Sequence, residues 1–225
     1  FGVPPEIIVA ILGVETKYGG NKGSFRVIDT LSSLAFDYPP RAAFFRKELR
    51  TFLVLAREQN MDPMETYGSY AGAMGFPQFM PSSWRNLAVD YSGDGKTDLI
   101  NSEVDAIGSI GNYFLANGWK SGEPVAVRAR ITGDNYDEAV STDLKSQSTL
   151  GELAGRGLEP RDPGLPPETP AWAIRLQGEN GAEFWLAFNN FYVITRYNRS
   201  YNYAMAVFQL AEALRNARRR PEPNS

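Results

Sequence analysis

The spacing of apolar residues along the chain predicts a mainly helical protein. Over Pro4 to Tyr18 apolar positions recur at the helical period, prolines occupy the first turn, and Gly19 and Gly20 are expected to stop the helix. The same period predicts further helices over residues 41–59, 105–116 and 203–218. A chain of 225 residues can bury one substantial core and a smaller subdomain.

The middle of the chain has a different pattern. Alternating apolar and polar residues predict strands over Val125–Ile131, Trp172–Leu176 and Phe184–Ala187. The proline-rich stretch LEPRDPGLPPETP, residues 158–170, predicts a loop. We therefore expect three parts: the first part of a helical core over residues 1–119, a small β-containing subdomain inserted at 120–187, and a return to the core with a C-terminal helix over 188–225.

One carboxylate shares the apolar face of the first predicted helix. Ile8, Ile11, Leu12 and Glu15 fall at i, i+3, i+4 and i+7. A carboxyl group among aliphatic neighbours at the negative end of a helix dipole is expected to have a raised pKa, so that it can donate a proton near neutral pH. The same spacing also suits a glutamate that caps the helix or pairs with a nearby lysine. The abrupt glycine stop favours a position beside a loop that a ligand can reach.

Composition removes several classes of chemistry. The chain has no cysteine and no histidine, which excludes disulfides, thiolate nucleophiles, catalytic triads with an imidazole and most zinc sites. Proton transfer near neutral pH must therefore come from a carboxylate, a tyrosine, a lysine or the substrate itself.

Charge and hydropathy limit the partners. A net charge of −3 gives no reason to expect nucleic acid, and the one basic cluster, at Arg215, Arg218, Arg219 and Arg220, is interpreted as a helix end. No apolar run approaches the roughly 18 residues of a membrane span. The first residues lack the basic region of a signal peptide, and because they begin almost inside a helix we expect the chain to be a piece of a longer one.

An acidic loop is a candidate metal site. Positions 1, 3, 5 and 6 of an EF-hand loop are matched by Asp90, Ser92, Asp94 and Gly95. Lys96 falls where a backbone carbonyl binds, but Asn101 replaces the bidentate carboxylate of position 12. Oxygen ligands favour calcium, or even sodium, with modest affinity. The alternative is a plain Asp-Gly turn that holds no ion.

Four ordered blocks now resemble a known family. They are ILGVETKYGG, SYAGAMGFPQFMPSSW, DYSGDGKTDL with VDAIGSIGNYF, and FYVITRYNRSYNYAMAV, and together they span Phe1 to about Leu214. These blocks resemble the B family of bacterial lytic murein transglycosylases. The resemblance implies a lysozyme-like helical core with Glu15 as the sole catalytic acid and base. It also implies cleavage of the β-1,4 bond between N-acetylmuramic acid and N-acetylglucosamine, assisted by the substrate's acetamido group, to give 1,6-anhydromuramic ends without water.

The resemblance also implies binding residues. Around the reaction centre it places Ser69, Gln78, Tyr113, Tyr197, Asn198 and Tyr203, and it names Asp105 as the last metal ligand, although one extra residue precedes it here. By composition alone, the glycines of residues 69–84 suit either the close approach of a polysaccharide or the tight packing of two helices.

Further expectations concern cofactors, partners and location. Catalysis is expected to need no cofactor, and any calcium or sodium ion is expected to be structural. Expected partners are peptidoglycan strands and cell-wall synthesis or remodelling proteins, with no nucleic acid, and the chain is expected to be a monomer. The periplasm or cell envelope is the expected location, with an outer-membrane anchor on a missing N-terminal segment as one option. Two alternatives stay open: a lysozyme- or chitinase-type hydrolase, and a glycan-binding module without turnover.

Overall fold

The computed structural model describes residues 1–219. Contacts divide the chain into two compact units. Among the described residues, the first contains Phe1, residues 3–116 and residues 214–219, and the second contains Gly2 and residues 117–213. Arg220 and the end of the expected 188–225 segment lie outside the described residues. The domain boundaries expected from the sequence stay a prediction.

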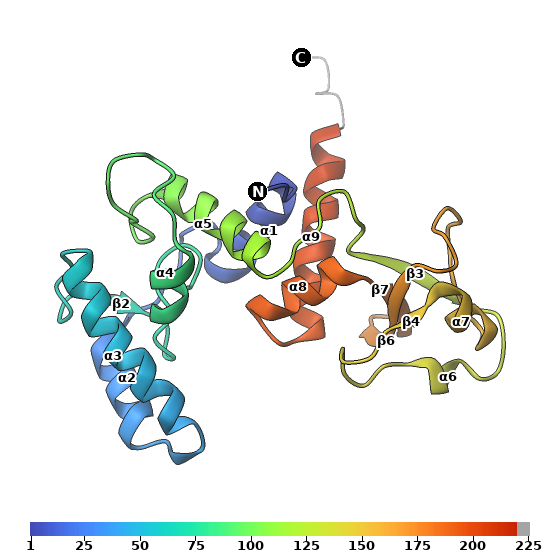
Figure 1. Ribbon diagram of the computed structural model, residues 1–225, viewed down its shortest axis with the longest axis horizontal. Helices are drawn as coiled ribbons and strands as arrows, with labels where there is room; N and C mark the ends of the chain where they lie inside the picture. The colour runs from blue at the N-terminus through green and yellow to red at the C-terminus, as the bar shows by residue number, and fades with distance from the viewer. Residues whose placement is uncertain (220–225) are drawn as a thin grey trace. The chain divides into compact units, whose positions relative to one another are not determined.

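The first unit is built from helices. They are α1 (Pro5–Thr16), α2 (Val27–Phe36), the short 3-10 helix η1 (Pro39–Arg41), α3 (Ala42–Glu58), α4 (Pro81–Leu87) and α5 (Glu103–Ala116), with a two-stranded antiparallel pair, β1 (Phe25–Arg26) and β2 (Tyr67–Gly68). Helix α3 packs against α2 and α4, and α5 packs against α1 and α4 (Figure 1). The buried side chains that these helices share include Ile11, Leu31, Phe52, Trp84, Ile110 and Phe114.

The end of α1 differs from the expectation. The predicted end is wrong by two residues, because the last helical residue is Thr16 and Lys17 already adopts a left-handed backbone at φ 50°. The Lys17 and Tyr18 N–H groups donate to the carbonyls of Gly13 and Leu12, each at 3.0 Å, in a Schellman arrangement. A Cβ on Gly13 would lie 2.8 Å from the Tyr18 ring. The glycine therefore admits the tyrosine ring that covers this helix end.

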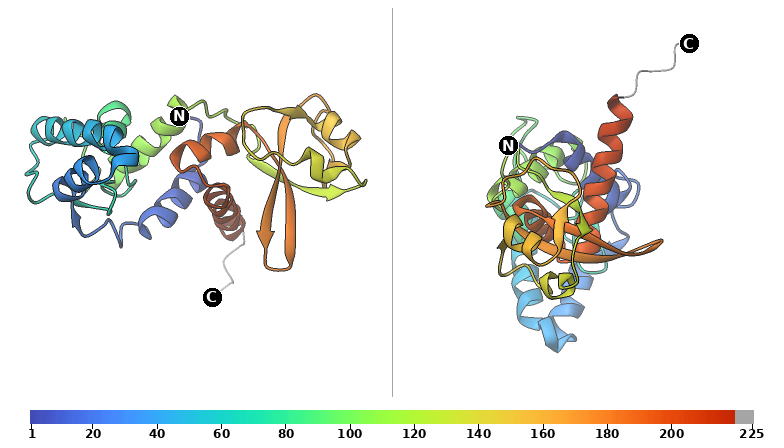
Figure 2. Two further views of the ribbon diagram at one scale, coloured as in Figure 1. Left: turned by 90° about the horizontal axis from the view of Figure 1, so that it is seen from below. Right: turned by 90° about the vertical axis from the view of Figure 1, so that its right-hand side faces the viewer.

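The second unit holds a five-stranded antiparallel sheet. Its strands are β3 (Ala126–Ile131), β4 (Ser148–Thr149), β5 (Leu158–Pro160), β6 (Pro170–Gly178) and β7 (Gly181–Ala187), in the order β4-β6-β7-β3-β5. Figure 2 shows β6 and β7 as a long hairpin. The helices of this unit are α6 (Tyr136–Ala139), α7 (Leu150–Gly155), α8 (Asn189–Tyr197) and most of α9 (Tyr201–Arg219). Leu150, Leu153, Leu158, Leu186 and Phe188 form much of the core under the sheet.

The predicted elements can now be compared with the observed ones. The three predicted strands and the helices expected over 41–59, 105–116 and 203–218 are confirmed. The expectation that the whole proline-rich stretch is a loop is wrong for Leu158–Pro160, which form β5, and for Pro170, which begins β6. The β5 strand lies at the sheet edge and pairs with β3. Pro160 has no N–H, but at an edge this removes no hydrogen bond to a second neighbouring strand. The chain is thus mainly helical with a small β-containing part. No helix among residues 1–219 is long and apolar enough to cross a membrane.

Candidate functional site

Glu15 lies in the last turn of α1 on a half-buried face of the helix. The helical period places it between Ile11 and Leu12, which are both buried, and beyond Ile8, which is half-buried like Glu15 itself. The predicted position of the carboxylate, at the helix end and on the apolar side, therefore agrees with the structure.

Thr16 anchors the residue next to Glu15. Its side chain is fully buried, and its Oγ1 lies 3.2 Å from the carbonyl oxygens of both Leu12 and Phe76. The same oxygen accepts a hydrogen bond from the Gly19 N–H at 3.0 Å. One hydroxyl therefore ties the end of α1 to a residue that lies 60 positions later in the glycine-rich segment.

The glycines of that segment face protein atoms. A Cβ on Gly75 would lie 2.2 Å from the Leu99 carbonyl oxygen, and one on Gly72 would lie 2.5 Å from the Leu31 side chain. Gly68 is as tightly enclosed by the Ala73 carbonyl, at 2.3 Å. Gly72 and Gly75, with Gly68 just before the segment, thus permit close packing against protein atoms, although none of them lies at a contact between two helices.

Ser69 and Gln78, two of the expected binding residues, are held by the same segment. The Ser69 hydroxyl accepts hydrogen bonds from the N–H groups of Ala71 and Ala73, at 3.3 and 3.0 Å. Gln78 has a left-handed backbone at φ 51°, and its amide nitrogen donates to the carbonyls of Gly75 and Lys22, at 2.9 and 3.1 Å. Both side chains are half-buried and their orientations are fixed.

Lys22 reinforces this arrangement. Its Nζ donates to the carbonyl oxygen of Ile100 at 2.7 Å and lies 4.3 Å from the centroid of the Phe76 ring. A Cβ on Gly19 would lie 2.2 Å from that ring, so the glycine leaves the space that Phe76 occupies. Glu15 and Gln78 are thus attached to one network through Thr16, Phe76 and Lys22.

Tyr113 joins the same unit from α5. Its ring lies 5.5 Å from that of Phe79, the residue after Gln78, and 6.1 Å from that of Phe114. The side chain is half-buried. The first unit therefore carries four of the expected residues on two helices and one loop: Glu15, Ser69, Gln78 and Tyr113.

The other three expected residues belong to the second unit. Tyr197 ends α8, the exposed Asn198 follows it with an extended backbone, and the half-buried Tyr203 lies in the first turn of α9. The Tyr203 N–H donates to the Ser200 hydroxyl at 3.3 Å. The helix break between α8 and α9 gathers these residues, and their approach to Glu15 stays a prediction.

The acidic loop brings its carboxylates together. One oxygen each from Asp90, Asp94 and Asp105 lies within 4.8 Å of the others. Asp105 is fully buried and accepts hydrogen bonds from the N–H groups of Tyr91, Ser92 and Asp98, at 3.0, 2.8 and 3.0 Å. The extra residue before Asp105 thus does not remove it from the loop.

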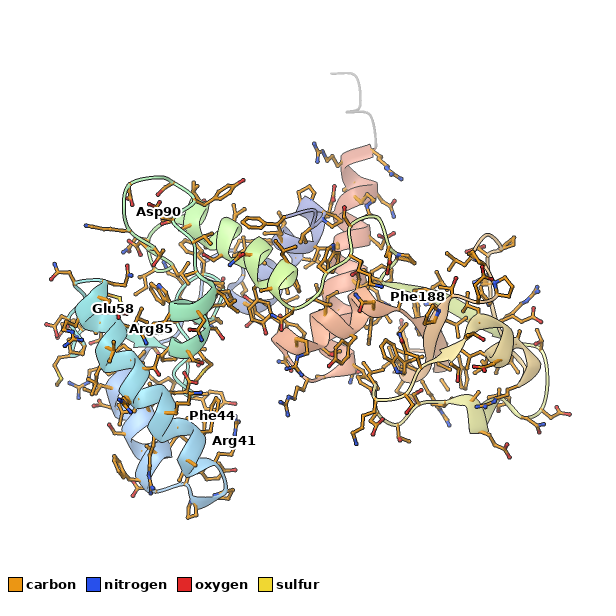
Figure 3. All side chains as sticks on the ribbon, viewed as in Figure 1. Arg41, Phe44, Glu58, Arg85, Asp90 and Phe188 are labelled. Atoms are coloured by element: carbon orange, nitrogen blue, oxygen red, sulfur yellow. The ribbon has the colours of Figure 1, made fainter. Side chains whose placement is uncertain are left out.

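The electrostatics of this cluster favour charged carboxylates. Burial raises the pKa of Asp105, but the hydrogen bonds from Ser92, Asp98 and Tyr91 outweigh it and lower the pKa overall. The N–H groups of Gly95, Gly93 and Asp94 and the Ser92 hydroxyl likewise lower the pKa of Asp90, which lies in the loop beside α5 (Figure 3). With Asp94 beside them, these carboxylates form an oxygen donor set suited to a hard cation.

The comparison with known families assigns the chain. A family model described as "Transglycosylase SLT domain" matches residues 1–212. The chain belongs to this family. The SLT domain match includes every expected catalytic, binding and metal-ligating residue.

Related proteins resemble this SLT domain over almost its whole length. It is 48% identical over 218 residues to the membrane-bound lytic murein transglycosylase B of Escherichia coli (strain K12), which covers 97% of this chain and 59% of that protein. This chain thus spans less than two thirds of that relative. The catenated lytic transglycosylase SltB1 from Pseudomonas aeruginosa is 55% identical with a TM-score of 0.91, over 96% of this chain and 71% of that one. Escherichia coli Slt35, solved in complex with calcium, is 48% identical with a TM-score of 0.89, over 98% and 69%.

The sequence did not predict the hydrogen bonds that three residues of this SLT domain make around the candidate site. The three residues are Thr16, Lys22 and Glu48. Glu48 is buried on α3, and its carboxylate accepts hydrogen bonds from the N–H and hydroxyl of Ser82, at 2.9 and 2.7 Å, in the first turn of α4. It therefore caps the helix that follows the glycine-rich segment. A charged residue on the buried face of an amphipathic helix was the available signal for Glu48.

Proposed function

We propose that this chain is a lytic transglycosylase that cleaves the β-1,4 bond between N-acetylmuramic acid and N-acetylglucosamine in peptidoglycan. The observation that carries the proposal is the placement of Glu15, which lies half-buried at the end of α1 beside the loop that holds Gln78. The family assignment and the murein transglycosylase relative support the same reaction.

The proposed chemistry uses one carboxyl group. Glu15 donates its proton to the glycosidic oxygen as the bond from that oxygen to the anomeric carbon breaks, and the substrate's acetamido oxygen stabilises the cation. The 6-hydroxyl oxygen of the same sugar then bonds to the anomeric carbon, and its proton passes to Glu15. The product is a 1,6-anhydromuramic end, and no water is consumed. Substrate assistance of this kind needs no second carboxylate.

Two nearby aspartates have structural roles that fit a single acid. Asp29 accepts a hydrogen bond from Arg26 at 2.7 Å in the first turn of α2. Asp37 follows the last turn of the same helix, where its N–H donates to the Ser33 carbonyl at 2.8 Å. The two aspartates thus lie at the two ends of α2, and Glu15 is the carboxyl group proposed for catalysis.

The proposed binding roles follow from how the side chains are held. Ser69 and Gln78 would contact the sugars around the cleaved bond from a rigid loop, and Tyr113 would stack on a sugar ring. Tyr197, Asn198 and Tyr203 would approach the acetamido group, which a tyrosine hydroxyl or an amide could orient. We propose that these residues belong to a lysozyme-like core that carries the β-containing part as an insertion.

The acidic loop is proposed as a structural calcium site. Asp90, Asp94 and Asp105 would supply carboxylates, Ser92 a hydroxyl oxygen and Lys96 a backbone carbonyl. The bound ion would neutralise the three carboxylates and stabilise the loop, and sodium is the weaker alternative. In calorimetric titrations Ca²⁺ should bind the wild type, and Asp94→Asn should weaken binding about tenfold or more. Equal binding by both proteins would contradict the assignment.

The cellular setting is proposed from the substrate. Peptidoglycan strands would be the partner, in the bacterial cell envelope, and the similarity to a membrane-bound lytic murein transglycosylase supports this setting. An outer-membrane anchor, recruitment by cell-wall synthesis or remodelling proteins and a monomeric state stay expectations.

Digestion of purified sacculi tests the proposed reaction. The wild type should release fragments with 1,6-anhydromuramic ends in mass spectra, and Glu15→Gln should reduce release by about 10²–10⁴-fold with the thermal unfolding temperature retained. The exposed Glu65→Gln is the matched control and should release fragments at the wild-type rate. Fragments heavier by one water would identify a hydrolase, and unchanged release by Glu15→Gln would contradict the catalytic role.

A further inference from the structure

A second, basic pocket lies wholly within the second unit. It encloses about 680 Å³ between α8, the start of α9 and the loop of residues 142–145. Two of the residues that line it are Arg196 and Arg199, which immediately precede Tyr197 and follow Asn198 in the chain. The pocket therefore adjoins Tyr197 and Asn198 along the chain.

One wall of this pocket is a face of α8. Tyr192, Thr195 and Arg196 fall at i, i+3 and i+4, and Arg199 follows one turn later in sequence. The Arg196 guanidinium lies 6.0 Å from the centroid of the Tyr192 ring. Behind Tyr192, the buried Trp172 ring is stacked at 5.8 Å with an interplanar angle of 28°. This wall thus combines a supported aromatic surface with the Arg196 guanidinium, and Arg199 lines the pocket beyond the end of the helix.

The opposite wall carries a tyrosine and an ion pair. Lys145 and Asp143 form an exposed pair at 2.9 Å. Burial raises the pKa of Tyr201, and the Asp143 carboxylate raises it further, so the phenol stays a hydrogen-bond donor at neutral pH. Among the described residues that line the pocket, three are cations and one is an anion: Arg196, Arg199 and Lys145 against Asp143.

We propose that this pocket binds a carboxylate-bearing stem peptide of the murein strand. Guanidinium groups pair with carboxylates through two parallel hydrogen bonds, and the tyrosine and threonine hydroxyls can bond to peptide groups. In peptidoglycan the stem peptides are attached to N-acetylmuramic acid, the sugar on one side of the cleaved bond. Because Tyr197 and Asn198 are proposed to contact the acetamido group, a pocket beside them in the chain suits a peptide on that strand. The inference rests on the proposed substrate.

Binding to a catalytically blocked protein tests the pocket without turnover. In the full chain with Glu15→Gln, calorimetry would compare a disaccharide that carries a tripeptide stem with the same disaccharide without the stem. Arg199→Ala should raise the Kd for the stem-bearing fragment about fivefold, which corresponds to about 1 kcal/mol. The Kd for the bare disaccharide should rise by less than about twofold. Raising the salt concentration should shrink the difference between Arg199→Ala and its parent.

A matched control separates the pocket from general charge. Arg175 is an exposed arginine of the same unit whose guanidinium lies 3.8 Å from Asp137, and it does not line the pocket. Arg175→Ala should leave both Kd values unchanged. Equal effects of Arg199→Ala on the two ligands, no effect on either, or an equal effect of Arg175→Ala would overturn the proposal. Failure of the sacculus digestion with stem-selective binding intact would instead refute only the proposed reaction.

Discussion

Lys22 Nζ lies 2.7 Å from the carbonyl oxygen of Ile100, which is two residues beyond Asp98 at the end of the acidic loop. The backbone carbonyl of Lys22 accepts a hydrogen bond from the Gln78 amide at 3.1 Å. The Phe76 N–H donates to the Leu99 carbonyl at 2.9 Å, next to Ile100. The acidic loop and the proposed sugar-binding loop are therefore connected through one lysine and one backbone pair.

Replacing Lys22 by methionine should weaken both loops. Methionine keeps the aliphatic stem but leaves the Ile100 carbonyl without its charged donor, and the loss should lower the free energy of unfolding by about 1–2 kcal/mol. The proposed turnover should fall through a higher KM, because Gln78 is held by the backbone of this residue. Urea unfolding and fragment release from sacculi measure the two effects.

Lys47→Met provides the matched control for this change. Lys47 is an exposed lysine of α3 whose backbone carbonyl accepts a hydrogen bond from the Thr51 hydroxyl. It should change neither stability nor release. If Lys22→Met unfolds at the same urea concentration as the wild type and its KM is unchanged, the contacts of Lys22 contribute neither to stability nor to substrate binding.

The sequence predicted those parts of the fold that depend on local periodicity. Helix α3 and the β6–β7 hairpin carry clear helical and alternating patterns, and both were found. The acidic loop could also be predicted from the sequence, because Asp90 to Asp94 are neighbours along the chain. Helix α4 was missed since it has seven residues, too few to display a period. Helix α8 was missed because FYVI is a continuous apolar run that suits a strand equally well.

The parts that the sequence did not predict depend on distant contacts. Thr16 meets Phe76 across 60 residues, Lys22 meets Ile100 across 78, and Glu48 meets Ser82 across 34. No local pattern encodes these pairs, because each needs several elements to be packed first. The position of Glu15 was predictable, whereas the hydrogen bonds that hold the neighbouring residues were not.

Thr16→Val should expose the importance of the buried hydroxyl. Valine has nearly the same shape, so the change isolates the hydrogen bonds, and it leaves the Gly19 N–H and the Phe76 carbonyl without their buried partner. The free energy of unfolding should fall by about 1–3 kcal/mol. Release from sacculi should also fall, because the end of α1 loses its attachment beside Glu15.

Thr16→Ser separates the hydroxyl from the methyl group. Serine keeps the hydrogen bonds and should retain most of the activity, although the lost methyl lowers stability by about 1 kcal/mol. Urea unfolding and release assays on both variants decide the question. Activity that follows the methyl group instead of the hydroxyl would contradict the anchoring role.

Glu58 and Arg85 connect the end of α3 to α4 through a two-point ion pair (Figure 3). Both hydrogen bonds are 2.7 Å long, and both side chains are exposed. The Arg85 guanidinium lowers the pKa of Glu58, while Glu58 raises the pKa of Arg85. NMR titration should therefore find the Glu58 pKa below its ordinary value, and Arg85→Gln should return it toward that value.

The lowered pKa of Glu58 determines the direction in which stability changes with pH. Because the folded-state pKa of Glu58 is lower than the unfolded value of about 4.3, its stabilising contribution is complete above that pH and disappears as the pH falls through the folded pKa. The free energy of unfolding should thus decline less steeply with acid in Glu58→Gln than in the wild type. Glu179→Gln, an exposed change in the turn between β6 and β7, should keep the wild-type slope. Identical slopes for the wild type and Glu58→Gln would mean that the ion pair does not form in solution.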